Sequence, residues 1–217
     1  MLKKDSTSFF PREDCVAESV LCKLATCKMI LERENPLRRD FNNFMKFLKK
    51  AGEKMEDFHY FQIQFAGSNE LKFRERVYCY ELYHQLRNIL GDDFRYKLDG
   101  EVDKAGHSFY PKLGPKKPDL IVHVPRDMDL NLAVIEVKPV TVEKRIRQLT
   151  KDINTLKGFL KEGDYYRAII LLYGNGQDLP KKIVSRVKSL IRNHDKHNQI
   201  LLLWHRGPGI KIKKVEI

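Results

Sequence analysis

The sequence predicts an α/β fold in which a central mixed sheet is flanked by helices. Two apolar runs bounded by proline, at residues 118–125 and 132–139, have the length and composition of buried strands. The segment that follows them has apolar residues at alternating steps of four and three, which is the spacing of an amphipathic helix. A strand, a basic helix and another strand come next, and this alternation is typical of an α/β sandwich.

Two helices are expected before residue 66, where they form an N-terminal helical attachment. The first begins at Pro11, a residue suited to the first turn of a helix, and ends before Pro36. The second covers residues 38–51 and stops at Gly52, and its apolar face comprises Phe41, Phe44, Met45 and Leu48. We therefore divide the chain into an N-terminal helical extension, residues 1–65, and a core domain, residues 66–217. The phenylalanines predict that the extension packs on the core or on a partner subunit, including a second copy in a homodimer.

The core domain is expected to begin with a helix over residues 70–90. Gly91 is its candidate C-cap, and its apolar residues are Val77, Tyr80, Leu82, Tyr83, Leu86 and Leu90. Residues 94–104 contain Asp99-Gly100, a pair that favours a tight hairpin, but a single strand with an excursion also fits them. A loop rich in glycine and proline then leads to the first of the two proline-bounded strands.

The two proline-bounded strands are expected to be antiparallel neighbours, because only a short polar turn over residues 126–131 joins them. The apolar stripe from Val142 to Leu160 predicts a long helix after the second strand. The remaining expected elements are a strand over residues 165–173, a basic amphipathic helix over 180–193 and a buried strand over 199–204.

The composition indicates a globular protein with a polyanionic partner. The chain of 217 residues has 41 Lys and Arg against 29 Asp and Glu, a formal net charge of +12, and 42% of its residues are hydrophobic. Excess positive charge favours binding to nucleic acid or to an anionic surface. No apolar run approaches the roughly 20 residues that cross a bilayer, and the N-terminus has no apolar secretion signal. We therefore expect a cytoplasmic protein that does not enter a membrane, with its four cysteines as free thiols.

Two carboxylates and a lysine are predicted to meet on the two neighbouring strands. Glu136 and Lys138 lie on one face of their strand, because side chains alternate, and hairpin pairing brings Asp119 beside them. Burying like charges together costs free energy, which a bound divalent cation would offset. Asp119, Glu136 and the carbonyl of Val137 offer the hard oxygen ligands that Mg²⁺ prefers, with Mn²⁺ as a substitute. Lys138 would orient or deprotonate a water molecule, or would stabilise charge on phosphate oxygens.

The pattern Pro118-Asp119, Glu136-x-Lys138, with each half on an expected strand, resembles the PD-(D/E)xK phosphodiesterase superfamily. The order helix, three strands, helix, strand of that family's restriction-endonuclease-like core resembles residues 70–173. The resemblance implies a nuclease that uses Asp119, Glu136 and Lys138 for catalysis. It also implies a metal-binding glutamate on the preceding helix, for which Glu81 is the matching position. The other interpretation of Glu81 is a solvent-facing residue of an amphipathic helix.

The resemblance further favours a DNA endonuclease of restriction, phage defence or repair. In the exonuclease branch the helix after the lysine carries Gln-x-x-x-Tyr, whereas here Gln148 is followed four positions later by Asp152. Two groups of basic residues next to the motif are expected to contact the nucleic-acid backbone: Lys116 and Lys117, and Lys144, Arg145, Arg147 and Lys151. A solvated helix face is the alternative for the second group. The alternative for the whole protein is a non-catalytic nucleic-acid-binding or assembly module.

Overall fold

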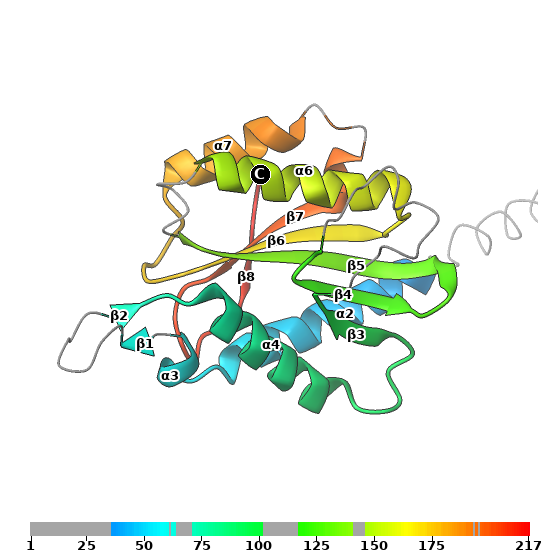
Figure 1. Cartoon of the computed structure of the whole chain (residues 1–217), viewed down its shortest axis with the longest axis horizontal. Helices are drawn as coiled ribbons and strands as arrows, with labels where there is room; N and C mark the ends of the chain where they lie inside the picture. Colours follow the sequence, from blue (N-terminus) through cyan, green and yellow to red (C-terminus); the bar gives the residue numbers. More distant parts are fainter. Residues whose placement is uncertain are drawn as a thin grey trace, which may run out of the picture. The chain divides into compact units, whose positions relative to one another are not determined.

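The strands of the core form one mixed sheet of six strands in the order β3-β4-β5-β6-β7-β8 (Figure 1). This computed structural model describes residues 36–60, 62–63, 71–101, 117–140, 146–192, 194 and 196–217. The pairs β5·β6 and β6·β7 are parallel, and the other three pairs are antiparallel. The strands are β3 (Lys97–Gly100), β4 (Leu120–Val124), β5 (Asp127–Pro139), β6 (Arg167–Tyr173), β7 (Ile200–His205) and β8 (Lys213–Val215). The predicted α/β class with a mixed sheet is thus confirmed.

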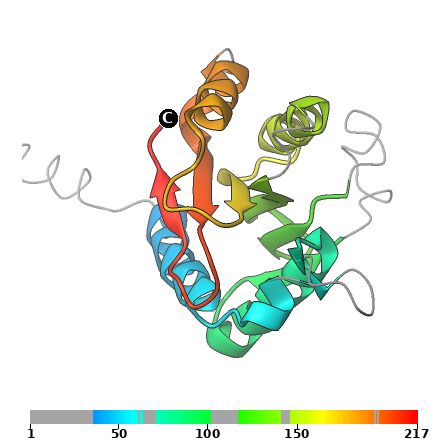
Figure 2. The same cartoon turned by 90° about the vertical axis from the view of Figure 1, so that its left-hand side faces the viewer.

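Helices cover both faces of this sheet (Figures 1 and 2). One face packs against α6 (Ile146–Glu162) and α7 (Lys181–Arg192), whose apolar residues join those of the strands in a single core. The other face lies toward α2 (Pro36–Glu53) and α4 (Glu75–Leu90). The smaller elements are α3 (Asp57–Tyr60), the strand pair β1 (Gln62–Ile63) and β2 (Leu71–Lys72), and a 3-10 helix, η2 (His197–Gln199).

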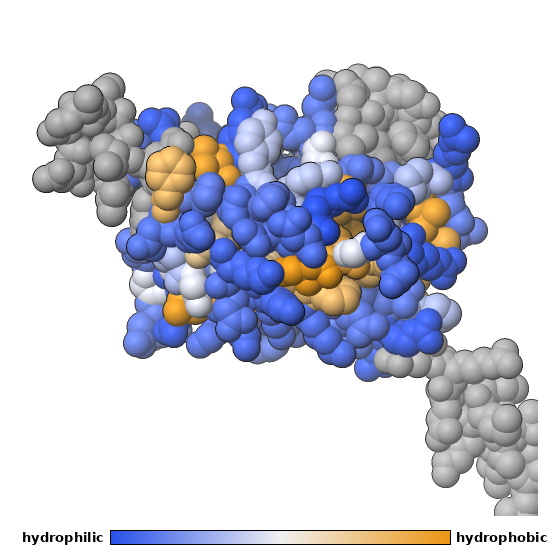
Figure 3. Space-filling view, turned by 90° about the horizontal axis from the view of Figure 1, so that it is seen from below, coloured by the Kyte–Doolittle hydropathy of each residue, from blue (hydrophilic) through white to orange (hydrophobic). Residues whose placement is uncertain are grey.

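The surface seen from the side of α2 and α4 is largely hydrophilic, with apolar side chains exposed in a few places (Figure 3). None of the helices in the described ranges combines the length and apolar character needed to cross a membrane. Phe58 and Tyr80 are the most exposed large apolar or aromatic side chains described, with 72% and 59% of their surface accessible.

Three local predictions differ from the structure. Of the two alternatives for residues 94–104, the hairpin is wrong and the single strand holds for β3, because Asp99 and Gly100 both belong to β3 and pair with β4. The turn predicted over residues 126–131 is shorter, since β5 already begins at Asp127, and Arg126 has the positive φ of 69° that a tight turn uses. Pairing with β4 extends β5 beyond the apolar residues that predicted it.

The predicted helix over 70–90 is also wrong at its start and in its buried face. The helix α4 begins at Glu75, after β2, and its buried residues are Tyr78, Cys79, Leu82 and Leu86. Tyr80, expected on the apolar face, is instead exposed. Tyr78 is buried because it stacks on Tyr173, with ring centroids 3.9 Å apart, and bonds to His205. A long-range aromatic contact therefore selects the face that the local apolar spacing does not identify.

The compact unit that carries the sheet runs from Asp40 to Ile217, whereas the sequence placed the start of the core at residue 66. The rings of Phe44 and Phe94 stack with centroids 6.5 Å apart, which joins α2 to the segment before β3. Tyr60 donates a hydrogen bond of 2.6 Å to the carbonyl of His205 in β7. Residues 40–60 thus pack on the sheet as part of the core. The predicted helix over residues 11–35 and three of the cysteines lie outside the described residues, and the fourth, Cys79, is buried and free.

Replacing Gly52 by alanine tests this packing of α2. A Cβ atom at Gly52 would lie 2.6 Å from Cγ1 of Ile212, which is itself buried. Alanine normally stabilises a helix by about 1 kcal/mol relative to glycine, but overpacking of this kind costs about 1–3 kcal/mol. We therefore expect Gly52→Ala to lower the free energy of unfolding in urea, whereas Asn42→Ala at an exposed position of the same helix leaves it unchanged or slightly higher. Equal or greater stability of Gly52→Ala would contradict this packing.

Candidate active site

The register between β4 and β5 brings the predicted acidic residues together. Leu120 pairs with Ile135, so Asp119, which directly precedes β4, lies beside Glu136 of β5. Asp119 is fixed there because the backbone N–H of Val137 donates a 2.7 Å hydrogen bond to its Oδ2. Glu136 and Lys138 then lie on the same face of β5, as the alternation of side chains requires. The strand pairing predicted from the sequence therefore does create an acidic cluster at this point.

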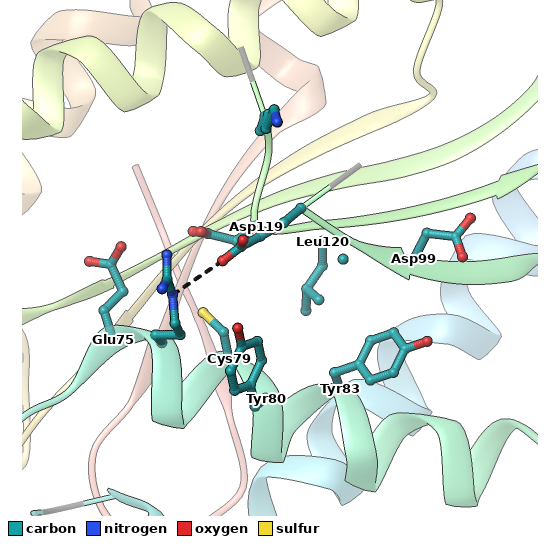
Figure 4. Close-up of a pocket in the computed structure, with 11 residues that line it drawn as sticks. Glu75, Cys79, Tyr80, Tyr83, Asp99, Asp119 and Leu120 are labelled. Atoms are coloured by element: carbon teal, nitrogen blue, oxygen red, sulfur yellow. Dashed lines mark ion pairs between the residues drawn. The ribbon is translucent and has the colours of Figure 1, made fainter. Parts of the chain in front are cut away.

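Lys138 is the centre of this cluster. Its Nζ lies 2.8 Å from Oε1 of Glu75, 3.4 Å from Oδ2 of Asp119 and 3.6 Å from Oε2 of Glu136. Glu75 is the first residue of α4, and Figure 4 shows its side chain extending from the start of that helix toward the sheet, where Asp119 lies. The side chains of Lys138 and Glu136 are 6% and 7% exposed, while those of Asp119 and Glu75 are 18% and 39% exposed. The cluster thus has a buried half and a half that reaches solvent.

The electrostatics of the cluster follow from burial and from the excess of acids. Burial, and then the negative charge of Asp119, raise the pKa of Glu136 well above its usual range. Burial by itself would lower the pKa of Lys138, but Asp119, Glu136 and Glu75 together raise it. Lys138 is therefore a charged ammonium group in this arrangement, which donates hydrogen bonds and holds the carboxylates together.

A fourth carboxylate comes from α6. Asp152 is 5% exposed, and its pKa is raised to about 6, mainly by burial. The positive charge of Lys138 lowers this pKa, whereas the negative charges of Glu75 and Asp119 raise it. Gln148, one turn earlier on the same helix, donates a 3.2 Å hydrogen bond to Oδ1 of Asp152. The other oxygen, Oδ2, is buried and has no hydrogen-bond partner among the described residues. Four carboxyl groups thus surround or approach one ammonium group, so the cluster holds more acidic groups than basic ones.

The donor set suits a hard divalent cation. Asp119, Glu136, Asp152 and Glu75 supply carboxylate oxygens, the ligands that Mg²⁺ and Mn²⁺ favour. Because the N–H of Val137 bonds to Asp119, the carbonyl of Val137 also lies on that edge of β5. In the described part of the chain, however, no three Asp, Glu, His or Cys side chains already form a group that would enclose an ion. Within this structure the ammonium of Lys138 balances part of the acidic charge.

Glu81, the position that the resemblance assigned to metal binding, is not part of the contacts around Lys138. It accepts a 2.6 Å hydrogen bond from Gln85 and lies 3.7 Å from Nε2 of His59, on the side of α4 that faces α3. Glu75 takes the position near Lys138 that was expected for Glu81. The sequence did not identify Glu75 because the helix was expected to begin at residue 70, which placed Glu75 within the helix and away from its end.

The predicted backbone-binding residues are only partly described. Lys116, Lys144 and Arg145 lie outside the described residues. Lys117 borders a pocket next to Asp119, and Arg147 and Lys151 are exposed on α6 in the turn that carries Gln148 and Asp152. Their contact with nucleic acid stays a prediction. His123 is a hydrogen-bonded sheet residue, since its Nε2 lies 2.8 Å from Oδ2 of Asp99.

The pocket beside Asp119 has a volume of about 600 Å³ and lies between α4 and the start of β4 (Figure 4). Its described lining from α4 is Glu75, Arg76, Cys79, Tyr80 and Tyr83, and from the strands and their ends Asp99, Gly100, Glu101, Lys117, Asp119 and Leu120. Glu75 and Asp119 therefore belong both to the pocket and to the cluster around Lys138. A ligand in the pocket would approach the acidic cluster from its solvent-exposed half.

Comparisons of the chain with protein-family models, with curated proteins and with solved structures found no match.

Proposed function

We propose that this protein is a divalent-metal-dependent nuclease that hydrolyses phosphodiester bonds, and specifically a DNA endonuclease. The observation that carries the proposal is the contact of the buried Lys138 ammonium with three carboxylates, Glu75, Asp119 and Glu136, at 2.8 to 3.6 Å. Such a cluster is costly to fold, because each ion loses water and the acids repel one another. Apolar residues of similar volume would be less costly at these strand positions, so the cost favours a chemical role.

The order of the elements supports the same proposal. The site is held by α4, β3, β4, β5, α6 and β6, which is the succession helix, three strands, helix, strand. This is the order of the PD-(D/E)xK core that the motif resembles. Within it the motif residues come from β5 and the start of β4, and the helices on either side add Glu75 and Asp152.

Each residue has a distinct role in the proposed reaction. Asp119, Glu136 and the carbonyl of Val137 would hold the cation, with Glu75 in the place expected for Glu81. The cation, when bound, would lower the pKa of a water molecule and polarise the phosphate. Lys138 would orient the attacking water and stabilise negative charge on the phosphate oxygens as a fixed ammonium group. The exposed lysines and arginines near the site would hold the strand through its phosphates, without reading its bases.

Cleavage of supercoiled plasmid tests the proposal. We expect purified protein to produce nicked and then linear DNA with Mg²⁺ or Mn²⁺, and no product with EDTA. Asp119→Asn is expected to lose cleavage, because the amide is a weaker metal ligand than the carboxylate. Degradation to short fragments without nicked or linear products would indicate an exonuclease. Failure to cut any of a panel of DNA and RNA substrates would overturn the proposal and favour the non-catalytic binding module.

Two glutamates of α4 allow a matched test of which one belongs to the active site. We expect Glu75→Gln to reduce plasmid cleavage at least tenfold, because this carboxylate lies 2.8 Å from Lys138. Glu81→Gln is expected to cleave within about twofold of the wild type, because its contacts are with Gln85 and His59. The initial rate of nicking at saturating Mg²⁺ measures both effects. The reverse ranking of the two variants would restore Glu81 as the site residue.

A further inference from the structure

Tyr80 and Tyr83 of α4 line the pocket next to Asp119 without a structural role that explains them. They are three residues apart and thus on one helix face, and Figure 4 shows both rings beside the pocket space. Tyr80 is 59% exposed and Tyr83 is half-buried. Among the described residues neither ring takes part in a hydrogen bond or ring contact, in contrast to the buried tyrosines 60, 78 and 173. Two accessible aromatic rings therefore border a pocket that ends at the acidic cluster.

The charges of the pocket decide which part of a nucleotide it would accept. Its lining has four carboxylates, from Glu75, Asp99, Glu101 and Asp119, against two cationic side chains, Arg76 and Lys117. Arg76 already pairs with Glu101 at 3.5 Å. A phosphate inside the pocket would be repelled by this excess of acids. A neutral, flat ring would not be repelled, and carboxylates accept hydrogen bonds from the amino groups of bases.

From these observations we propose that the pocket receives one unpaired nucleobase, which stacks on Tyr80 and Tyr83. The neighbouring phosphate would stay outside the pocket, at the Asp119 end, where the proposed cation would offset the repulsion by the carboxylates. This inference rests on the proposed nuclease function, because it takes Asp119 as the point of cleavage. The volume of about 600 Å³ lies within the range of about 300–1,000 Å³ that is typical of pockets for small ligands.

The proposal defines the substrate class. A base within a duplex is stacked on both faces and paired at its edge, so it reaches such a pocket only if it is unpaired or flipped out. Stacking on aromatic side chains is a common means of holding single strands without sequence preference. The preferred substrate is therefore single-stranded DNA, or DNA with an unpaired segment at the cleavage position, and not relaxed continuous duplex. Supercoiled plasmid fits this class because negative supercoiling favours local unpairing.

Binding measurements without cleavage test this inference. The probes are a fluorescein-labelled single strand of mixed sequence, the same strand annealed to its complement, and a strand of equal length made of abasic nucleotides. Anisotropy is measured at fixed low salt in EDTA. We expect the wild type to bind the mixed single strand more tightly than the other two probes. Tyr80→Ala is expected to weaken binding of the mixed strand about tenfold and to leave binding of the duplex and abasic strand within about twofold.

A control variant and a second pocket variant show whether the loss of binding comes from the pocket or from a general loss of folding. Phe58→Ala removes an aromatic side chain that is 72% exposed on α3 and does not line the pocket, and it is expected to bind as the wild type. Gly100→Val would narrow the pocket while leaving both tyrosines in place. A Cβ atom at Gly100 would lie 3.6 Å from Leu120 and 3.9 Å from Tyr83, at ordinary contact distances. We expect this variant to lose the preference for the mixed single strand as Tyr80→Ala does.

The outcomes separate this inference from the proposed function. If the protein cuts plasmid but Tyr80→Ala and Gly100→Val bind the mixed strand as the wild type, the nuclease stands and the base pocket is refuted. If the protein does not cut but both variants lose the single-strand preference, the pocket stands and the nuclease is refuted. An equal loss of affinity for all three probes, or a wild type without the preference, would also overturn the inference.

Discussion

Lys138→Met is expected to lose both catalysis and a large part of the stability of the protein. Methionine fills a similar volume but removes the only ammonium group found within 4 Å of Glu75, Asp119 and Glu136 in the described residues. Removal of one partner from a buried ion cluster costs about 3–5 kcal/mol. Loss of a residue that stabilises transition-state charge costs about 10²–10³-fold in rate. Plasmid nicking and urea unfolding measure the two effects separately.

The double variant Lys138→Met/Glu136→Gln tests the structural role of Lys138, which is to neutralise the buried acids. Glu136 is the most buried acid that contacts Lys138, so its neutralisation should restore most of the lost stability without restoring cleavage. Because Glu136 is itself a proposed ligand of the cation, cleavage stays lost in this variant, and only its stability is informative. If Lys138→Met alone unfolds at the same urea concentration as the wild type, the contacts of Lys138 with the carboxylates do not contribute to the stability of the fold.

The stability lost in Lys138→Met is also expected to depend on pH. A carboxyl group whose pKa is raised by folding binds its proton more tightly in the native state than in the unfolded state. When the pH is above the native-state pKa, this group is ionised in both states, and its burial lowers the stability of the fold. The loss of stability disappears as the pH falls toward the pKa of the unfolded state. The pKa of Glu136 is already raised by burial and by Asp119, and loss of Lys138 raises it further. The difference in stability between wild type and Lys138→Met should therefore be larger at pH 8 than at pH 5.

Tyr60→Ala is expected to be the most destabilising substitution of a residue outside the acidic cluster. Tyr60 is fully buried, and its hydroxyl donates to the carbonyl of His205 at 2.6 Å and accepts from the N–H of Gly174 at 2.7 Å. Its ring packs edge-on against Tyr78, Tyr173 and His205, with centroids 5.1 to 5.6 Å apart. Truncation of a large buried aromatic side chain costs about 3–5 kcal/mol.

Two matched variants divide this effect between the hydroxyl and the ring. Tyr60→Phe keeps the ring contacts and loses only the hydrogen bonds, so about 1–2 kcal/mol of stability should be lost. Phe58→Ala, two residues earlier and exposed, should change the free energy of unfolding by less than about 0.5 kcal/mol. Urea unfolding measures all three. A stability of Tyr60→Ala close to that of Phe58→Ala would show that residues 40–60 do not belong to the core.

Some residues of the site can be predicted from side-chain alternation and strand pairing, and others cannot. Asp119, Glu136 and Lys138 follow from two strands joined by a short turn, because alternation and pairing place them on one face. Glu75 does not follow, because its position depends on where α4 begins, and β2 and the turn before the helix shift that point five residues from the predicted start. Asp152 stands four residues after Gln148, but the sequence did not place it in the site. Its place next to the acidic cluster depends on how α6 packs over the sheet.

The sequence by itself determined the α/β class, the order of the strands and helices from residue 75 to 205, and the motif residues on β5 and just before β4. These features depend on apolar periodicity and proline boundaries, which act over a few residues. Only the tertiary structure decided that residues 40–60 belong to the core, that Tyr78 and not Tyr80 is buried, and that Glu75 joins Lys138. Each of those outcomes depends on contacts between residues far apart in the chain, such as Tyr60 with His205. The free energy of such contacts cannot be predicted from the spacing of residues within one segment.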